Sequence, residues 1–159
     1  EGVHAARDAY DVFNLLVADE SGLFHYANVS GKITAVEPGI HGLSNDLLDT
    51  PWPKVQRGKA ELASLLAEPR DRLVDGLFRV LEDTRPPPDD ALPQTGVSLE
   101  WERLLATAFI STAGYGTRAS TVVLVPSVKR SVRPNAPFQD GPMSFEPSVG
   151  WQVEQPCFV

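Results

Sequence analysis

The stretch that decides the fold covers residues 39–59 and reads Gly39-Ile-His-Gly-Leu-Ser-Asn-Asp-Leu-Leu-Asp-Thr-Pro-Trp-Pro-Lys-Val-Gln-Arg-Gly-Lys59. It runs from the end of a predicted strand into the start of a predicted helix. Its glycines allow unusual backbone conformations, and the prolines on either side of Trp52 fit the first turn of a helix. The small polar side chains of His41, Ser44 and Asn45 lie between these features, so the stretch is also a candidate binding loop.

A three-stranded antiparallel meander is predicted before this stretch. Residues 11–19 form an apolar run of strand length, residues 22–28 return with partial alternation, and residues 33–36 follow a second turn. The amide of Asn14 interrupts the first run. A buried amide needs hydrogen-bonding partners, so Asn14 either bonds to the backbone of a neighbouring loop or faces a site.

Two helices are predicted after the stretch, and together they can cover one face of a sheet. The first begins at Thr50 or Trp52 and ends at Pro69, and the second covers residues 70–82. The charged side chains of the first helix are predicted to remain in solvent; these are Lys54, Arg57, Lys59 and Glu61. Apolar residues recur at helical spacing, namely Val55, Leu62, Leu65 and Leu66 in the first helix and Leu73, Val74, Leu77, Phe78 and Leu81 in the second.

The remainder of the chain is predicted to be less regular. Residues 83–97 are proline-rich and predict an extended surface connection, and residues 98–105 predict a short helix or helical turn. Residues 107–111 and 120–125 predict two strands joined by a hairpin connection. Prolines recur after residue 126, so a domain over residues 1–125 is predicted to be followed by an irregular tail over residues 126–159, with one short strand around residues 143–146.

Composition and charge exclude several classes of protein. Of the 159 residues, 42% are hydrophobic and 22% charged, as in an ordinary globular domain. The net charge of -7 argues against nucleic-acid binding, which relies on clustered Lys and Arg. No apolar run approaches the roughly 20 residues of a membrane-spanning helix, and the first residues do not resemble a signal peptide. We therefore expect a soluble, cytoplasmic protein without a membrane span.

The sequence gives little support for metal or nucleophile chemistry. The single cysteine, Cys157, excludes an intrachain disulfide and a Cys-based metal site, and the three histidines lack metal-ligand spacing. His41 and Ser44 lie close together in one loop, which rarely gives the geometry of a nucleophile and its base. Glu100 and Glu102 are predicted to be solvated charges. No catalytic residue and no metal ligand are predicted.

A second candidate loop covers residues 114–121 and reads Gly114-Tyr-Gly-Thr-Arg-Ala-Ser-Thr121. Its glycines let backbone N–H groups approach an anion, and the guanidinium of Arg118 can bind a carboxylate or phosphate through two hydrogen bonds. It is not a phosphate-binding P-loop, because it lacks the Gly-Lys-Ser/Thr ending and leads into a strand. The alternative is a glycine-rich hairpin turn in which Arg118 forms a surface ion pair, and composition alone favours this alternative.

Three motifs in this order resemble one family. The run Phe13-Asn-Leu-Leu-Val-Ala-Asp19, the stretch at residues 39–55 and the loop at residues 114–121 are similar to the transport and Golgi organisation protein 2 family. It is also called the NRDE family, after an Asn-Arg-Asp-Glu motif near its N-terminus, and the resemblance is closest to bacterial members. That motif is absent here, and residues beyond 125 are only loosely similar. The early apolar run agrees with this absence, so a missing N-terminal segment of the same protein is expected to lie against the first strand.

The resemblance implies an α+β fold like that of the N-terminal-nucleophile hydrolases, a sandwich of antiparallel β-sheets with flanking helices. In such enzymes a Cys, Ser or Thr at the start of the mature chain attacks an amide carbonyl. That residue is not in this chain. Members of the family are associated with Golgi organisation, haem trafficking and lipid metabolism, and the resemblance implies neither a settled activity nor a cofactor.

The sequence therefore supports three hypotheses about function. The first is binding or trafficking of a small amphipathic anion, either haem or an acyl or lipid derivative. The second is an N-terminal-nucleophile amidohydrolase whose nucleophilic Cys lies in the missing segment, and the third is a purely structural role for the two loops. The residues predicted to bind the anion are Asn14, His41, Ser44, Asn45, Gly114, Tyr115, Gly116, Thr117 and Arg118.

Overall fold

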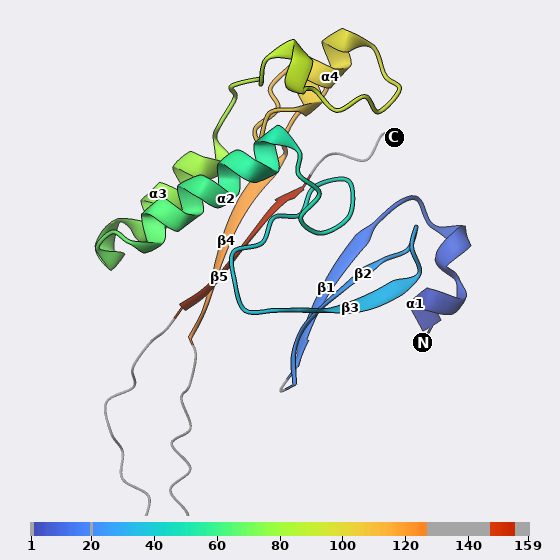
Figure 1. Cartoon of the computed structure of the whole chain (residues 1–159), viewed down its shortest axis with the longest axis horizontal. Helices are drawn as coiled ribbons and strands as arrows, with labels where there is room; N and C mark the ends of the chain where they lie inside the picture. Colours follow the sequence, from blue (N-terminus) through green and yellow to red (C-terminus); the bar gives the residue numbers. More distant parts are fainter. Residues whose placement is uncertain (1, 20, 127–146, 155–159) are drawn as a thin grey trace, which may run out of the picture.

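The computed structural model describes residues 2–19, 21–126 and 147–154 (Figure 1). These residues form a mixed α+β structure with a three-stranded antiparallel sheet, a two-stranded sheet and several helices, which confirms the α+β class; the sandwich of sheets stays a prediction. The elements in chain order are α1 (Gly2–Ala5), the 3-10 turn Arg7–Ala9, β1 (Asn14–Asp19), β2 (Gly22–Ala27), β3 (Lys32–Val36), α2 (Pro53–Leu66), the 3-10 turn Arg70–Arg72, α3 (Leu73–Leu81), the 3-10 turn Asp89–Ala91, α4 (Leu99–Leu105), β4 (Ala119–Pro126) and β5 (Pro147–Glu154).

The predicted meander is confirmed. β1 pairs with β2 so that Asn14 lies opposite Ala27, and β2 pairs with β3. Alternate residues of a strand point to opposite faces of the sheet. Leu15, Leu16 and Val17 nevertheless expose 41%, 46% and 49% of their surface. In the described part of the chain, β1 is therefore an edge strand with apolar residues exposed on both faces.

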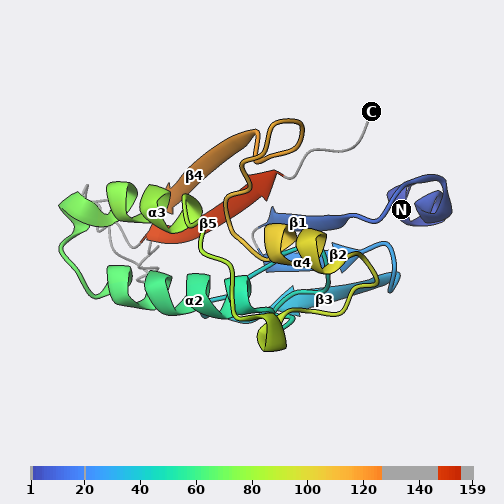
Figure 2. The same ribbon diagram turned by 90° about the horizontal axis from the view of Figure 1, so that it is seen from above.

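The predicted helix pair is also confirmed. Trp52 is the N-cap of α2 with Pro53 in the first turn. α2 and α3 run antiparallel, side by side, and α3 packs against β4 (Figures 1 and 2). The core between them consists of Leu62, Leu73 and Leu77, with Ile40, Leu65 and Val122 packed against it. Three residues predicted for the apolar faces are instead exposed, namely Leu66, Val74 and Phe78.

The strand predicted at residues 107–111 does not form. The N–H groups of Ala108 and Phe109 both donate to the carbonyl of Asp83, at 3.1 Å and 2.9 Å. The hydroxyl of Thr107 donates to the Leu104 carbonyl at 3.0 Å and also lies 2.9 Å from the Phe109 carbonyl. These bonds use backbone groups that would otherwise form the ladder of a strand. Only an isolated bridge between Ser111 and Gly116 remains of the predicted hairpin.

Part of the tail that was predicted to be irregular forms a strand, β5. β5 pairs antiparallel with β4 over its whole length, and Pro147 lies opposite Pro126 at the end of the ladder. A proline at the first position of a strand removes no interior ladder bond. Pro147 is therefore compatible with pairing. The short strand predicted around residues 143–146 lies outside the described residues.

Candidate ligand-binding site

Asn14 fixes the loop of residues 37–52 to the meander. Its Oδ1 accepts a hydrogen bond from Nε2 of the buried His25 at 2.8 Å, and its Nδ2 donates to the carbonyl oxygens of Asp46 at 3.0 Å and Ser44 at 3.5 Å. The amide of Asn14 thus bonds to the backbone of a neighbouring loop, which is the first of the two alternatives considered for it. Ser44 and Asp46 are positioned by this contact.

Asp49 organises the same loop from within. It has a φ angle of 62°, in the left-handed region that Asp and Asn tolerate better than most residues. Its carboxylate accepts hydrogen bonds from the backbone N–H of Gly42 at 3.0 Å, from Nζ of Lys59 at 2.6 Å and from Nδ1 of His41 at 2.6 Å. The other ring nitrogen of His41 donates to the carbonyl of Glu37 at 2.8 Å.

Both ring nitrogens of His41 therefore face acceptors, which favours the doubly protonated imidazolium. The hydrogen bond with Asp49 raises the pKa of His41 above 6.5. Burial alone would raise the pKa of Asp49, but the bonds from Lys59 and His41 outweigh it and lower that pKa to about 2. With both ring nitrogens bonded in this way, His41 has no free nitrogen lone pair with which to act as a general base. Its two hydrogen bonds instead join Glu37 to Asp49 within the loop.

The second candidate loop is also held by its own polar groups. The N–H of Thr117 donates to the Ile110 carbonyl at 2.8 Å, and its hydroxyl accepts from the Ile110 N–H at 2.9 Å. A Cβ atom on Gly116 would lie 2.7 Å from the Ile110 carbonyl oxygen, so only glycine fits there, whereas a Cβ on Gly114 would meet nothing within 4 Å. Arg118 is exposed and forms no ion pair with the side chains that the structure describes. The predicted surface ion pair is thus not seen among them.

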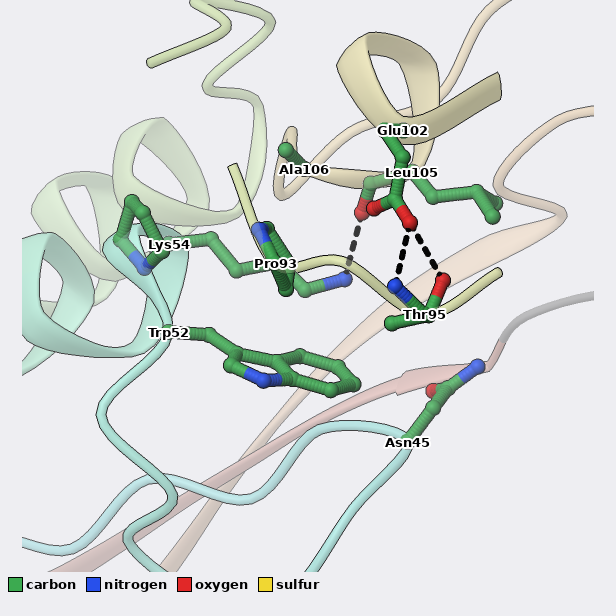
Figure 3. Close-up of a pocket in the computed structure, with 9 residues that line it drawn as sticks. Asn45, Trp52, Lys54, Pro93, Thr95, Glu102, Leu105 and Ala106 are labelled. Atoms are coloured by element: carbon green, nitrogen blue, oxygen red, sulfur yellow. Dashed lines mark hydrogen bonds between the residues drawn. The ribbon is translucent and has the colours of Figure 1, made fainter. Parts of the chain in front are cut away.

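A cavity of about 190 Å³ lies between the start of α2 and α4 (Figure 3). Its lining comes from two parts of the chain that are far apart in sequence, residues 45–54 and residues 93–106. Apolar groups dominate the wall, and the polar side chains are those of Asn45, Lys54, Thr95 and Glu102. The residues that line it are Asn45, Trp52, Pro53, Lys54, Pro93, Thr95, Glu102, Leu105 and Ala106.

Lys54 is the cation of this cavity, which corrects the prediction that it stays in solvent. Its Nζ donates to the backbone carbonyl of Leu105 at 2.8 Å and lies 5.8 Å from the centre of the Trp52 ring. Burial lowers the pKa of Lys54 to about 8, because the charged form loses hydration. At neutral pH the amine is therefore still mostly protonated, with hydrogen-bonding capacity beyond the Leu105 contact.

Glu102 is the anion of the cavity, which corrects the prediction that it is a solvated charge. The residue is only 6% exposed. Its Oε1 accepts hydrogen bonds from the N–H of Thr95 at 2.6 Å and the hydroxyl of Thr95 at 2.7 Å. These two bonds draw the proline-rich connection over residues 83–97 back against α4, so part of that connection forms a wall of the cavity.

The predicted binding residues are only partly brought together. Asn45 lines the cavity, and Asn14, Ser44 and His41 support the loop that carries Asn45. The loop of Gly114, Tyr115, Gly116, Thr117 and Arg118 contributes nothing to the lining. It contacts α4 through the rings of Trp101 and Tyr115, whose centres lie 5.4 Å apart.

Of the residues that line the cavity, only Asn45 was predicted as a site residue, and the residues missed include Trp52, Lys54 and Glu102. One signal was available for Glu102, because it shares the i, i+3, i+4 face of α4 with Leu105 and Ala106. An acidic residue on an apolar helix face indicates a buried charge. No comparable signal distinguishes Lys54 from the other charged residues of α2.

The described residues give no indication of a metal site or a membrane-spanning helix. Within residues 2–19, 21–126 and 147–154, no group of three or more His, Cys, Asp or Glu side chains could hold a metal ion. Among the same residues, no helix combines the length and apolar character needed to cross a bilayer.

The fold and the cavity define an α+β protein in which a helix pair packs on a two-stranded sheet beside an antiparallel meander. A family model described as Transport and Golgi organisation 2 matches residues 1–133. The chain belongs to this family, and the resemblance found in the sequence is confirmed.

Individual relatives agree with this assignment. The chain is similar to the Transport and Golgi organization protein 2 homolog of Bos taurus, with 36% identity over 138 residues, covering 77% of this chain and 49% of that relative. It is 35% identical over 129 residues to the human protein of the same name, covering 73% of this chain and 47% of the relative. The chain thus spans about half the length of the curated relatives it matches.

Proposed function

We propose that this chain binds a small amphipathic anion, an acyl derivative, in the cavity between α2 and α4. The observation that carries the proposal is the Lys54 ammonium on an otherwise largely apolar wall. An apolar pocket with a few convergent polar groups is typical of small-molecule sites. The carboxylate of the ligand would bind Lys54, and its apolar chain would lie against Trp52, Pro93 and Leu105.

The volume of the cavity favours an acyl chain over haem. Typical ligand pockets occupy about 300–1,000 Å³, whereas this cavity has about 190 Å³. A flat macrocycle with two carboxylates needs far more room than that. A short acyl chain, or the end of a longer one, is the part of the proposed ligand class that fits.

Lys54 replaces Arg118 as the main anion contact in this proposal. Arg118 lies on a loop whose backbone groups at Thr117 are already bonded to Ile110. The contacts of Asn14, His41 and Ser44 support the loop that holds Asn45 at the cavity, so these predicted residues would act by positioning. Arg118 stays a second candidate contact for a longer ligand.

The proposal is tested by measuring octanoate binding to the complete protein by calorimetry. Lys54→Met is expected to weaken binding about tenfold or more, since a hydrogen bond to a charged group contributes roughly 1.5–3 kcal/mol. The matched control is Lys32→Met on the exposed strand β3, which should leave binding unchanged. Equal affinity of wild type and Lys54→Met, or no binding to wild type, would overturn the proposal.

The enzyme hypothesis makes a different prediction for the complete protein. An N-terminal-nucleophile amidohydrolase would have both sheets in one sandwich and a nucleophilic Cys outside this chain. Loss of amide hydrolysis when a Cys following the initiator Met is replaced by Ala would support it. If the cavity is purely structural, Lys54→Met should instead lower the melting temperature without a separate loss of binding.

A further inference from the structure

The buried carboxylate of Glu102 constrains which anion the cavity accepts. Within the described residues, the hydrogen bonds to this carboxylate both come from Thr95 and both end on Oε1. Glu102 and Lys54 line the same cavity (Figure 3), yet no ion pair joins them. The cavity thus holds a buried carboxylate whose second oxygen is not bonded to Lys54.

A simple carboxylate ligand would be placed close to this second negative charge. Two carboxylates in one site of low dielectric constant repel each other, and a hydrogen-bond donor between them reduces that cost. Lys54 is bonded to Leu105 and not to Glu102, so its remaining donors can bind the carboxylate of the ligand. A ligand that also presents an N–H group to Glu102 would supply a donor to the second carboxylate.

We propose that the cavity selects an acyl anion that carries an N–H donor beside its carboxylate, the chemistry of an N-acylated amino acid. The carboxylate would bind Lys54, the amide N–H would donate to Glu102, and the acyl chain would lie along Trp52 and Pro93. This inference rests on the proposed function, because it names the ligand class for the same cavity.

The amide N–H is the group that distinguishes this class from other acyl anions. A site built to hydrogen-bond a ligand N–H rejects the analogue that lacks it, because the buried acceptor is then left unpaired. Replacing the N–H by an ester oxygen keeps the length and charge of the ligand and puts an acceptor opposite Glu102. The preference for the amide over the ester, compared between the wild type and Glu102→Gln, therefore reports on Glu102.

The test compares N-hexanoylglycine with its ester analogue, hexanoyl glycolate, by calorimetry with the complete protein. The wild type is expected to bind the amide at least about tenfold more tightly than the ester. Glu102→Gln should remove or reverse this preference. Its amide oxygen can still accept both bonds from Thr95, while its NH₂ group places a donor where the carboxylate oxygen was.

The outcomes separate this inference from the proposed function. Equal binding of amide and ester to the wild type, with both lost in Lys54→Met, would overturn the inference and leave the proposed function standing. Absence of binding for both ligands and for octanoate would overturn both. An amide preference that persists in folded Glu102→Gln would also contradict the role of Glu102.

Discussion

At the scale of single residues, the contacts of Asp49 predict how the loop of residues 37–52 responds to pH. The pKa of His41 is raised above 6.5, so its contribution to stability is complete below pH 6.5 and is lost as pH rises through its folded pKa. The pKa of Asp49 is lowered from 3.8 to about 2, so its contribution is present above pH 3.8 and is lost as pH falls toward 2.

This prediction is checked by following the His41 ring by NMR in wild type and in Asp49→Asn. The wild-type midpoint should lie above 6.5, and the variant midpoint should fall, because the hydrogen bond with the carboxylate is the main cause of the shift. Asp49→Asn should also destabilise the fold by about 1–3 kcal/mol. Asp46→Asn, at an exposed position of the same loop, is the control. An unchanged His41 midpoint would show that Asp49 does not hold the ring.

At the scale of elements, two glycines of one loop should behave in opposite ways. Gly116→Ala forces a methyl group to within 2.7 Å of the Ile110 carbonyl oxygen, whereas Gly114→Ala meets no atom within 4 Å. We expect Gly116→Ala to lower the free energy of unfolding by about 1–3 kcal/mol. Gly114→Ala should be neutral or slightly stabilising, since it restricts the unfolded chain.

Urea denaturation measures both variants. Equal losses for Gly114→Ala and Gly116→Ala would contradict the close approach at Gly116. A loss of octanoate binding in a stable Gly114→Ala variant would restore the loop of residues 114–118 as an anion site.

The elements that were predicted correctly are those with local signals. The start of α2 follows from Pro53 after Trp52, and the meander follows from three short apolar runs separated by turns. Residues 107–111 were mispredicted because their N–H groups bond to the distant carbonyl of Asp83. β5 was missed because its partner β4 is remote in sequence and the intervening prolines suggest irregular structure.

The candidate site was harder to predict for the same physical reason. Its walls come from residues 45–54 and 93–106, which meet only after the chain folds. Lys54 and Glu102 look like ordinary surface charges until the contacts to Leu105 and Thr95 are known. Asn45 was predicted because it lies in a loop with unusual composition, a signal that needs no tertiary information.

At the scale of the whole molecule, the exposed apolar residues of β1 lead us to expect that another segment of the protein covers this strand. A strand that is apolar on both faces is typical of a sheet covered on both sides, and Leu15, Leu16 and Val17 are exposed in the described residues. The expectation that another segment of the same protein lies against β1 stays a proposal. Amide exchange at residues 15–17 should be slower in the complete protein than in a chain limited to these 159 residues. Equal exchange rates would contradict it.

The central claim is that Lys54 is the half-buried cation that holds an acyl anion. The most direct measurement is the titration of its ε-amino group by NMR in ¹⁵N-lysine-labelled protein, with and without saturating octanoate. The claim predicts a midpoint of about 8 in the free protein, which rises with octanoate because a bound carboxylate favours the charged amine. A free midpoint near the ordinary value of 10.5, or a midpoint that octanoate does not move, would contradict the claim.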